Sequence, residues 1–555
     1  MRGEKLMTSG AASFEAGRGE SAHGKTCVFL DGFSLTIKDI VAVARGGARV
    51  ELSGDAGVRM AVDISRQLLV DEIGRGTALY GITTGFGDSA HRHVPAGAAL
   101  RLQENLIRFL GCGTGAMATA ETVRAVMLVR ANTLARGHSG VRIELIEQLV
   151  NFLNHHITPQ IPEEGSVGAS GDLVPLSYVA AALTGERDVI YREEIQPAAK
   201  ALVSAGLAPL TLEPKEALAL VNGTAFMTGL AVLALADAQR LAVFSDVNTA
   251  MAVEVLHGLV DPFDEFVHDT AKPHPGQVQS AARVRNLLRS SQFVSRSRVN
   301  PTRKASGYIE LPRAVQDKYS IRCAPQFTGV LWDTISWASD WLTIEVNSSN
   351  DNPLVDPVTG RVLGAGNFSG GHVALAMDAL RTAVASVADL MDRQVALVVD
   401  EKFNGGLTPN LVARLPAEDP DAGLHHGFKG MQLACSSLTA EALSLTMPLG
   451  SFSRSTECHN QDKVSMGTTA ARRTRDVVAL TEKVAIIQLL ALCQAADLRG
   501  SNGLGETRLV HDRVRRVAPE VSRDREMDVD ITHVLRLLHD GVLLDGVSDA
   551  PLRKD

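Results

Sequence analysis

The chain has 555 residues, of which 45% are hydrophobic and 21% are charged, and its formal net charge is −8. These values allow a sizeable core, and the length would hold about three or four units of ordinary size. The acidic balance and the lack of any long run of Lys and Arg argue against nucleic acid or an anionic membrane surface as a partner. We therefore expect a small molecule as the ligand.

Six cysteines are scattered without a Cys-x-x-Cys spacing, which suggests neither a zinc site nor a disulfide framework and fits a reducing compartment. Residues 1–26 contain no apolar run, so they are predicted to form a disordered leader and not a secretory signal. The longest apolar stretches are interrupted by charge, as Asp237 and Arg240 interrupt 230–243, and none is expected to cross a bilayer. The sequence thus favours a soluble, cytoplasmic protein without a metal.

The first predicted elements are a helix and a loop. An apolar run from Val28 leads to Ser34, which is predicted to cap a helix over 37–44. The stretch 79–87 reads Leu-Tyr-Gly-Ile-Thr-Thr-Gly-Phe-Gly, and its glycines predict a mobile loop that contains Tyr80. Residues 102–135 carry apolar side chains at three-and-four spacing, which predicts helices that pack into a core.

The stretch 165–175 reads Gly-Ser-Val-Gly-Ala-Ser-Gly-Asp-Leu-Val-Pro, with a centre of very small residues, Ala169-Ser170-Gly171. Gly171 has no Cβ, so its amide nitrogen can approach the carbonyl carbon of Ala169 closely. Loss of water from the ring so formed and from the Ser170 hydroxyl would leave an unsaturated, electron-poor five-membered ring. By itself such a triplet is more typical of an ordinary turn before a helix.

The second half of the chain reads mainly as long helices. Residues 216–243 are apolar on nearly all sides, which predicts a helix inside a bundle. Asn-Gly-Thr at 222–224 interrupts this pattern, and a buried Asn222 would need partners for its donors and its acceptor. Further helices are predicted after 366–368, over 477–498 and over 531–538. The predicted fold class is therefore mainly α, with a long central helical bundle.

Three polar segments lie between these helices. Residues 316–326 read Gln-Asp-Lys-Tyr-Ser-Ile-Arg-Cys-Ala-Pro-Gln and contain Arg322, although an isolated Arg is more often part of a surface ion pair. Residues 347–353 fit a structural turn at least as well as a site. Residues 455–467 read Ser-Thr-Glu-Cys-His-Asn-Gln-Asp-Lys-Val-Ser-Met-Gly.

Together these segments resemble the aromatic amino acid ammonia-lyase and aminomutase family. The motifs that carry the resemblance stand in the family's order and cover about residues 30 to 500. They are Tyr-Gly-x-x-Thr-Gly-Phe-Gly from Tyr80, Ala-Ser-Gly within 165–173, Asn-Gly-Thr at 222–224, the segment around Arg322, and Asn-Gln-Asp followed by Val-Ser-Met-Gly at 460–467.

The resemblance implies a mainly helical fold that assembles as a homotetramer, with sites that draw residues from three subunits. A smaller N-terminal region would carry the active-site loops beside the central bundle. We accordingly expect a leader at 1–26, an N-terminal region at 27–220, a bundle at 221–505 and a helical cap at 506–555.

The resemblance also implies a cofactor. In the family, Ala-Ser-Gly cyclises autocatalytically to 4-methylidene-imidazol-5-one (MIO), which we expect here from Ala169, Ser170 and Gly171, with no metal and no pyridoxal phosphate. Eliminating ammonia from an amino acid requires removal of an unactivated β-proton, and common side chains supply nucleophiles, acids and bases but no electrophile. The MIO would supply that electrophile to the substrate amine.

The site residues implied by the resemblance form two sets. Tyr80 is expected to remove the β-proton, Arg322 to hold the substrate carboxylate, and Glu441 to lie as a buried carboxylate near the substrate amine. The expected catalytic set is Tyr80, Ala169, Ser170, Gly171 and Tyr319. The expected substrate-binding set is Phe109, Leu110, Asn222, Gln316, Arg322, Asn367, Phe368, Glu441 and Gln461.

The expected substrate is L-phenylalanine, with trans-cinnamate as product. Phe109 stands where relatives selective for histidine or tyrosine commonly have a histidine, and an apolar ring end would leave a polar ring group without a partner. Glu441 tempers this expectation, because histidine-specific relatives share a carboxylate there. Histidine or tyrosine ammonia-lyase, and an aromatic 2,3-aminomutase that returns ammonia to the β-carbon, stay open as alternatives.

Other classes of protein fit less well. An inactive helical relative kept for binding would show a broken motif, and none is evident at Tyr80, Ser170 or Arg322. A pyridoxal phosphate lyase would need a lysine beside a glycine-rich phosphate cradle, which the sequence does not offer convincingly. Fumarase-type lyases share a helical bundle but lack the ring-forming triplet.

Overall fold

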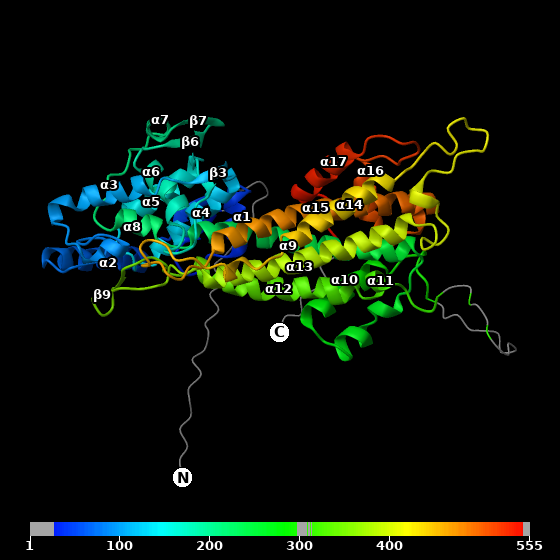
Figure 1. The fold of residues 1–555 in the computed structure, drawn as a ribbon, viewed down its shortest axis with the longest axis horizontal. Coiled ribbons are helices and arrows are strands. Elements are labelled where there is room, and N and C mark those ends of the chain that lie inside the picture. Colours follow the sequence, from blue (N-terminus) through cyan, green and yellow to red (C-terminus); the bar gives the residue numbers. More distant parts are fainter. Residues whose placement is uncertain (1–26, 297–307, 309–310, 312–313, 548–555) are drawn as a thin grey trace, which may run out of the picture.

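The computed structural model describes residues 27–296, 308, 311 and 314–547. Most of these residues lie in α-helices, which confirms the mainly α fold class (Figure 1). The molecule is elongated, with an N-terminal region of shorter helices and strands at one end and a bundle of long helices extending from it. The expected leader, 1–26, falls outside the described residues.

The N-terminal region opens with a small parallel pair of strands joined through a helix. These elements are β1 (Cys27–Leu30), α1 (Ile37–Ala44) and β2 (Arg49–Leu52). The cap of α1 is Thr36 and not the predicted Ser34, because Thr36 and Asp39 each accept a hydrogen bond from the other's backbone N–H. This reciprocal capping box satisfies two N–H groups, whereas the Ser34 hydroxyl donates to the Asp31 carboxylate at 2.6 Å.

The rest of this region packs around α4, in which every residue from 122 to 135 is buried. Small antiparallel sheets pair β3 with β5, and β6 with β4 and β7. The elements are α2 (Ala56–Gly74), α3 (Ala99–Phe109), β3 (Thr114–Met117), α4 (Ala120–Ala135), α5 (Ile143–Asn154), β4 (Thr158–Pro159), β5 (Pro162–Glu164), α6 (Leu173–Leu183), β6 (Asp188–Tyr191), β7 (Glu194–Pro197), α7 (Ala198–Ser204) and α8 (Glu216–Val221).

The bundle and its C-terminal helices follow. Its elements are α9 (Ala225–Val255), α10 (Pro275–Leu287), α11 (Tyr319–Arg322), α12 (Ala324–Val346), β8 (Leu354–Asp356), β9 (Arg361–Leu363), α13 (Gly371–Val399), α14 (Lys429–Ser444), α15 (Gly467–Arg499), α16 (Arg508–Arg515) and α17 (Asp528–His539). Single turns of 3-10 or π helix are η1 (Gly87–His91), η2 (Ala96–Ala98), η3 (Asp261–Phe263), η4 (Phe266–Thr270), η5 (Pro409–Leu411), η6 (Leu449–Ser451) and η7 (Ser501–Gly503).

Helix α9 lies at the centre of the bundle and packs against α4, α12, α13 and α15. By length and composition α9 could cross a membrane, which differs from the sequence expectation. However, 72% of its most apolar window is buried within the protein. The charges that interrupt it are paired, Asp237 with Arg45 at 2.7 Å and Arg240 with Glu482 at 2.8 Å. These contacts are those of a core helix.

The predicted helix over 216–243 is in fact two helices, α8 and α9, separated at 222–224. Asn222 is extended, and Gly223 has a φ of +149°, a value that residues other than glycine rarely adopt. The freed backbone forms an isolated β-bridge from Gly223 to Gly171. Tertiary contact with the triplet therefore overrides the local helical pattern.

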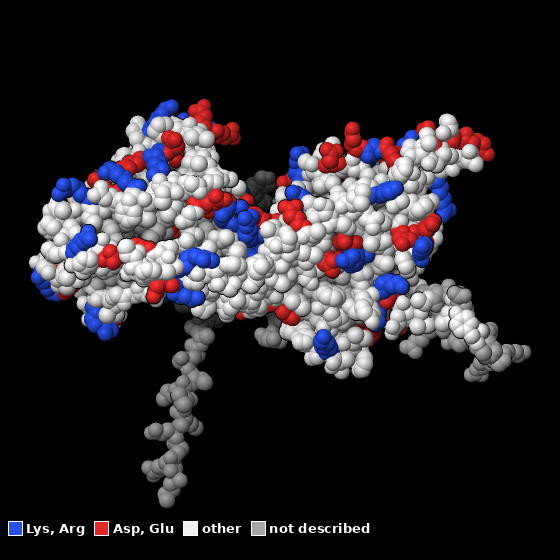
Figure 2. Space-filling model, viewed as in Figure 1, with Lys and Arg blue, Asp and Glu red and all other residues white. Residues whose placement is uncertain are grey.

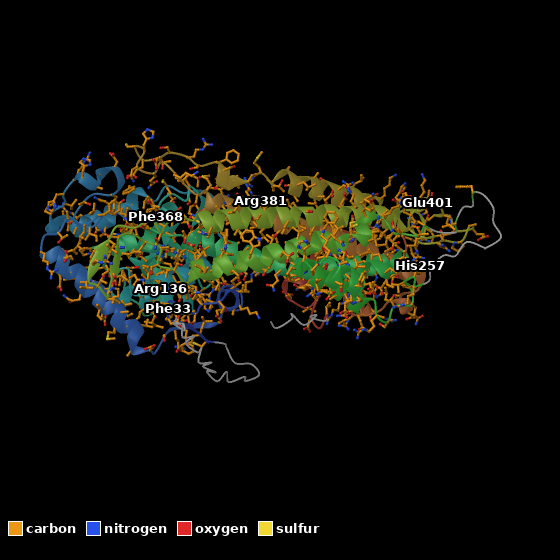
Figure 3. The ribbon with its side chains drawn as sticks, turned by 90° about the horizontal axis from the view of Figure 1, so that it is seen from below. Phe33, Arg136, His257, Phe368, Arg381 and Glu401 are labelled. Atoms are coloured by element: carbon orange, nitrogen blue, oxygen red, sulfur yellow. The ribbon has the colours of Figure 1, made fainter. Side chains whose placement is uncertain are left out.

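The two ends of the molecule are distinct. Figure 3 shows Phe368 at the end that carries the N-terminal region, and His257 and Glu401 at the opposite end of the bundle. On the face in Figure 2, basic and acidic side chains are interspersed and neither sign forms a continuous patch. The main hydrophobic core runs through both the N-terminal region and the bundle. The expected borders at 220/221 and 505/506 stay predictions.

Candidate active site

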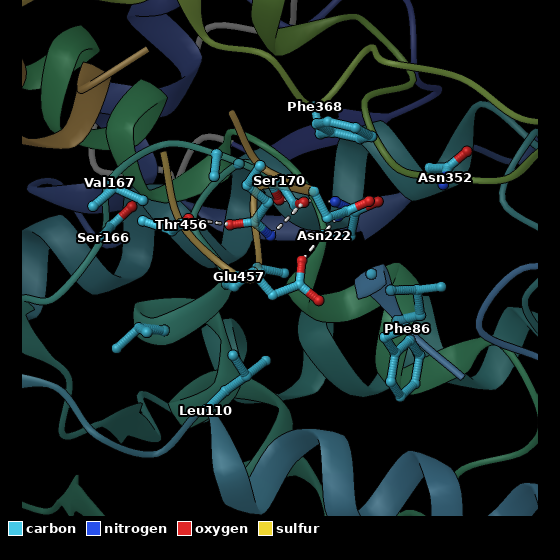
Figure 4. Close-up of a pocket in the computed structure, with 18 of the residues that line it drawn as sticks. Phe86, Leu110, Ser166, Val167, Ser170, Asn222, Asn352, Phe368, Thr456 and Glu457 are labelled. Carbon is cyan, nitrogen blue, oxygen red and sulfur yellow. Dashed lines mark hydrogen bonds between the residues drawn. The ribbon is translucent and has the colours of Figure 1, made fainter. Parts of the chain in front are cut away.

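A cavity of about 560 Å³ lies where α3, α6 and α8 meet the loops around residues 80–87 and 456–463. This volume is typical of a site for a small molecule. In Figure 4, Ser170 and Asn222 lie near its centre, with Phe368 on one side and Leu110 on the other. Nine of the predicted site residues line it, namely Tyr80, Phe109, Leu110, Ala169, Ser170, Gly171, Asn222, Phe368 and Gln461.

The triplet forms a tight turn immediately before α6. Gly171 has a φ of +67°, and a Cβ built on it would lie 2.1 Å from the carbonyl oxygen of Gly223. The backbone N–H of Asp172 donates to that same carbonyl at 2.8 Å, which holds the two strands of backbone together. Any side chain at position 171 would clash with backbone, which cannot move away cheaply. Contact with Gly223 therefore requires glycine at position 171, and the close approach of the Gly171 nitrogen to Ala169 stays a prediction.

Both oxygens of Ser170 accept hydrogen bonds from amide side chains. Asn222 Nδ2 donates to the Ser170 carbonyl at 2.8 Å, and Gln461 Nε2 donates to the Ser170 hydroxyl at 3.2 Å. Gln461 is itself oriented by Thr456, whose hydroxyl donates to its Oε1 at 3.0 Å. Since Ala169 is only 8% exposed and Gly171 is pressed against backbone, the residues present fit a ring closed between positions 169 and 171.

Asp172, which was not among the predicted site residues, connects the triplet to Ser166 in the same stretch and to two other segments. Its carboxylate accepts hydrogen bonds from the Met227 backbone N–H at 2.8 Å, from the Ser166 hydroxyl at 2.9 Å and from the Thr468 hydroxyl. Burial raises the pKa of Asp172, and these donors oppose that rise. Its position directly after Ala-Ser-Gly is the signal that could have identified it.

The tyrosine loop is held over the cavity by its own backbone and by Glu457. The Gly87 N–H donates to the Tyr80 hydroxyl at 2.8 Å, and the Asp88 N–H donates to Glu457 Oε1 at 2.9 Å. Burial is the main cause that raises the pKa of Tyr80, and the Glu457 charge raises it further. The Gly87 N–H acts in the opposite direction, because it stabilises the phenolate.

Glu457 begins a run of strained backbone. Residues Glu457, Cys458 and His459 have φ values of 53°, 51° and 66°, a left-handed conformation that costs roughly 1–2 kcal/mol for each non-glycine residue. Two hydrogen bonds to the Glu457 carboxylate, from the Asp88 N–H and from Asn460 Nδ2, contribute about 1.5–3 kcal/mol each and offset much of that cost. Glu457 was not among the predicted site residues, although it lies within the segment 455–467.

Two buried cations lie behind the triplet. Arg130 of α4 is 1% exposed and donates to the Asn222 carbonyl at 3.0 Å. Burial lowers the pKa of Arg130 to about 10, so the guanidinium stays charged at neutral pH. Lys215 is fully buried and pairs with Asp351, and its pKa is also lowered, chiefly by burial. Neither cation was selected from the sequence, because nothing local marks an Arg or Lys as buried.

The far end of the cavity is apolar. Leu106 and Phe109 of α3 and Leu110 directly after it line the cavity, and its apolar lining also includes Leu173 and Val174 of α6 and Leu218 of α8. Phe109 is 61% exposed, so this end of the cavity is open to solvent in a single chain. An aromatic ring would find apolar surface here, and the side of the cavity that carries Ser170 and Gln461 would bind the polar part of a ligand.

Five predicted site residues do not line this cavity. Asn367 is next to it, where its amide donates to the Ser349 carbonyl at 3.2 Å. Glu441 is exposed on α14, so the expected buried carboxylate is not buried within one chain. Tyr319 is 71% exposed, and Gln316 is exposed as well, at the other end of the bundle with Arg322. In this group, Arg322 lies over the Tyr319 ring, 4.7 Å from its centroid.

The length of α12 explains this separation. Arg322 precedes the first residue of α12, and Asn350, which follows its end, approaches Gly223 beside the triplet. A helix of 23 residues with a rise of about 1.5 Å per residue extends roughly 35 Å. The neighbouring Asp317 accepts a hydrogen bond from Leu259, close to the His257 end of the bundle in Figure 3. Arg322 therefore cannot reach the cavity of its own chain.

Comparisons with known proteins bear on the site as a whole. A family model described as aromatic amino acid lyase matches residues 35–516. The histidine ammonia-lyase of Gloeobacter violaceus is 40% identical over 527 residues, which cover 95% of this chain and 98% of the relative. The coverage shows that the similarity is not confined to the motifs around the cavity.

Two solved structures have the same fold. Tyrosine aminomutase from Streptomyces globisporus has a TM-score of 0.88 at 35% identity, and the match covers 94% of this chain and 98% of that one. Phenylalanine aminomutase from Pantoea agglomerans has a TM-score of 0.86 at 35% identity, with coverage of 92% and 98%. With the family model and the relative above, these matches confirm the motif-based prediction: the chain belongs to the aromatic amino acid lyase family and is a carbon–nitrogen lyase.

Proposed function

We propose that this protein is an ammonia-lyase for an aromatic L-amino acid and that it uses an MIO formed from Ala169, Ser170 and Gly171. The observation that carries the proposal is the contact of Gly171 with the Gly223 carbonyl, beside a serine whose two oxygens are held by Asn222 and Gln461. Such close packing fixes the conformation of the three-residue turn from which the proposed ring would close. When formed, the ring supplies an electrophile for the substrate amine, which ordinary side chains lack.

The chain's own residues have separate tasks in this proposal. Tyr80 removes the β-proton from its position over the cavity, and the Gly87 N–H stabilises the phenolate that this requires. Asn222 and Gln461 keep the triplet oriented, and the apolar ends of α3 and α6 hold the aromatic ring. Tyr319, Gln316 and Arg322 are assigned to the site of another subunit, where Arg322 would clamp the substrate carboxylate.

The assembly proposed is a cytoplasmic homotetramer. A single chain leaves its cavity open at Phe109 and carries its carboxylate clamp about one helix length away. Large apolar side chains are also exposed along α12, along α14 and just after the end of α14, which favours an interface on the bundle. They are Phe327 (44% exposed), Val330 (56%), Ile344 (67%), Leu433 (70%), Leu443 (41%) and Met447 (62%).

The comparisons favour histidine over the expected phenylalanine as the substrate. Two relatives support this choice, the histidine ammonia-lyase of Gloeobacter violaceus, 40% identical to this chain, and that of a Geobacillus species, 37% identical. Histidine is therefore the first candidate. Glu441 is consistent with histidine as the substrate, because histidine-specific members share a carboxylate there. In this proposal Glu441 contributes to the site of another subunit.

A specific observation keeps phenylalanine as the second candidate. The ring end of the cavity presents Phe109, Leu110 and Leu106, and no polar side chain of α3 lines it beside them. An imidazole there would lose hydrogen bonds with water unless another subunit supplied a partner. The aminomutase outcome differs only in where ammonia finally goes, so analysis of the products from histidine and phenylalanine separates all three outcomes.

The first prediction concerns the ring and the base. The intact protein should be two waters lighter than its encoded mass, and Ser170→Ala should have the full mass for its sequence and lose most activity. Tyr80→Phe should keep the lighter mass yet lose turnover by about 10²-fold or more, the usual contribution of a positioned acid–base group. Intact-mass spectrometry and product formation measure both. An active wild type of full mass would contradict the proposal.

A second prediction uses the charge beside the base. Because Glu457 and burial both raise the pKa of Tyr80, turnover should rise toward alkaline pH as the phenol ionises. Glu457→Gln removes one of these causes, so the rising limb of kcat against pH should move to lower pH. Asp462→Asn, a second carboxylate that lines the cavity without affecting Tyr80, is the matched control. If the rising limb of kcat against pH is unchanged in Glu457→Gln, Tyr80 is not the group whose titration controls turnover.

A third prediction tests the ring end. Phe109→His should raise kcat/KM for tyrosine and histidine relative to phenylalanine, because a polar ring group gains a partner worth about 1–3 kcal/mol, or roughly 5- to 150-fold. Leu100→His lies on the same helix, is 47% exposed and does not line the cavity, so it should leave the ratios unchanged. Equal ratios in Phe109→His and the parent would show that Phe109 does not select the ring.

A fourth prediction tests the shared site. Tyr80→Phe and Arg322→Ala should each be nearly inactive alone, but chains co-expressed in equal amounts should regain activity at about a quarter of the sites, since the two residues then come independently from different subunits. Tyr80→Phe mixed with Ser170→Ala is the control, because both residues line one chain's cavity and should not complement. Lack of recovery in the first mixture, with intact assembly, would show that Arg322 acts otherwise.

A further inference from the structure

Arg130 is a buried cation that none of the tasks above uses. It comes from the middle of α4, where all neighbouring residues are buried, and it is 1% exposed. Among the described residues, its guanidinium makes one hydrogen bond, from Nη2 to the Asn222 carbonyl at 3.0 Å, and its Nε has no partner. Burying a guanidinium with so few hydrogen bonds is costly, which calls for an explanation other than simple packing.

Its position relative to the triplet provides that explanation. A Cβ built on Gly223 would lie 2.0 Å from Arg130 Nη2 and 2.8 Å from its Cζ. On the other side, a Cβ built on Gly171 would lie 2.1 Å from the Gly223 carbonyl oxygen. Guanidinium, Gly223 backbone and Gly171 backbone therefore form three layers in direct contact. Arg130 is the rigid rear layer, since α4 is fixed on all sides.

The surrounding charges keep the guanidinium in this place. Asp172 and Asp351 are the carboxylates that favour its charged form, and Lys215 already pairs with Asp351. Arg130 makes no ion pair at hydrogen-bond distance in the described structure, so it is held by position and by the Asn222 carbonyl. The guanidinium is planar, charged and rigid at its tip, so it can pack against a peptide group and hold that group in place.

We infer that Arg130 is the positioning residue for cyclisation of the triplet, holding the Asn222–Gly223 peptide so that it presses Gly171 toward Ala169. The inference rests on the proposed function, because it assumes that the ring forms. It concerns maturation of the protein and not the turnover of substrate. The effect of losing Arg130 should therefore be visible in the covalent state of the chain before any substrate is added.

The step that Arg130 would assist is balanced without an oxidant. The Gly171 nitrogen forms a bond to the carbonyl carbon of Ala169, and the carbonyl oxygen leaves as water with the amide protons of Gly171 and Ser170. A carbon–nitrogen double bond remains between Ala169 and Ser170. The Ser170 hydroxyl then leaves as a second water with the Ser170 Cα proton. Each ring closure thus removes two waters and transfers no electrons to another molecule.

Arg130→Met and Arg124→Met form a matched pair for the test. Arg124 lies on the same helix, is 6% exposed and donates to the Val43 and Leu153 carbonyls, away from the cavity. Both changes remove a buried guanidinium and retain an unbranched stem. Circular dichroism establishes folding, and intact-mass spectrometry of the purified chain measures dehydration. We expect Arg124→Met to be two waters lighter than encoded, and folded Arg130→Met to consist mainly of the full-mass form.

Arg130→Lys supplies the graded variant, since it keeps a donor for the Asn222 carbonyl but lacks the planar fork. We expect a mixture of full-mass and dehydrated chains that matures more slowly than the wild type. Folded Arg130→Met that is fully dehydrated would overturn the inference. If Arg130→Met does not fold, complete dehydration of Arg130→Lys at the wild-type rate would overturn it, whereas a mixture supports it.

Two further outcomes complete the test. If both Arg130 variants fail to fold while Arg124→Met folds, the inference is overturned, because Arg130 then serves the fold and not ring closure. A wild-type chain of full mass would instead overturn the proposed function, and it is recognised before any Arg130 variant is measured. The two failures are thereby distinguishable.

Discussion

The contact between Gly171 and Gly223 is the constraint on which the rest of the site depends. Two backbones can approach this closely only where both positions lack a Cβ and both adopt a positive φ. The contact in turn requires the long apolar helix to break into α8 and α9, because a helical Gly223 would have its carbonyl engaged along the helix. The break exposes the Asn222 side chain and carbonyl to the triplet and to Arg130.

Charge is arranged around this contact in an unusual way for a protein interior. Asp172 in front and Arg130, Lys215 and Asp351 behind are all nearly or fully buried. Each carboxylate is met by several donors, which reduces the cost of burying it. The result is a backbone turn fixed from both sides. A turn held in one conformation favours the proposed reaction between neighbouring backbone atoms, because those atoms are already positioned for it.

Much of this was accessible from the sequence, and the reasons for the failures are physical. Apolar patterning predicted α13, α15 and α17, and an apolar run followed by a cap signal predicted α1. The family resemblance predicted nine of the residues that line the cavity. Periodicity could not predict the break at 222–224, since a tertiary contact made by Gly223 overrides the local apolar pattern. The Arg130 and Glu457 contacts join residues far apart in the chain, so no local signal marks them.

Helix geometry explains why some residues that the family motifs assign to the site do not line the cavity. Arg322 and the triplet lie near opposite ends of α12, a distance of roughly 35 Å that no side chain can span. The bundle therefore keeps Arg322 and Tyr319 away from the cavity of their own chain, and Tyr319 is exposed at that end. If those residues act on substrate, the bundle length must match the spacing between subunits. The length of the helices would then set the distance between Arg322, which would bind the substrate carboxylate, and the Tyr80 base of the same chain, and so determine how subunits must be spaced for Arg322 of one chain to meet Tyr80 of another.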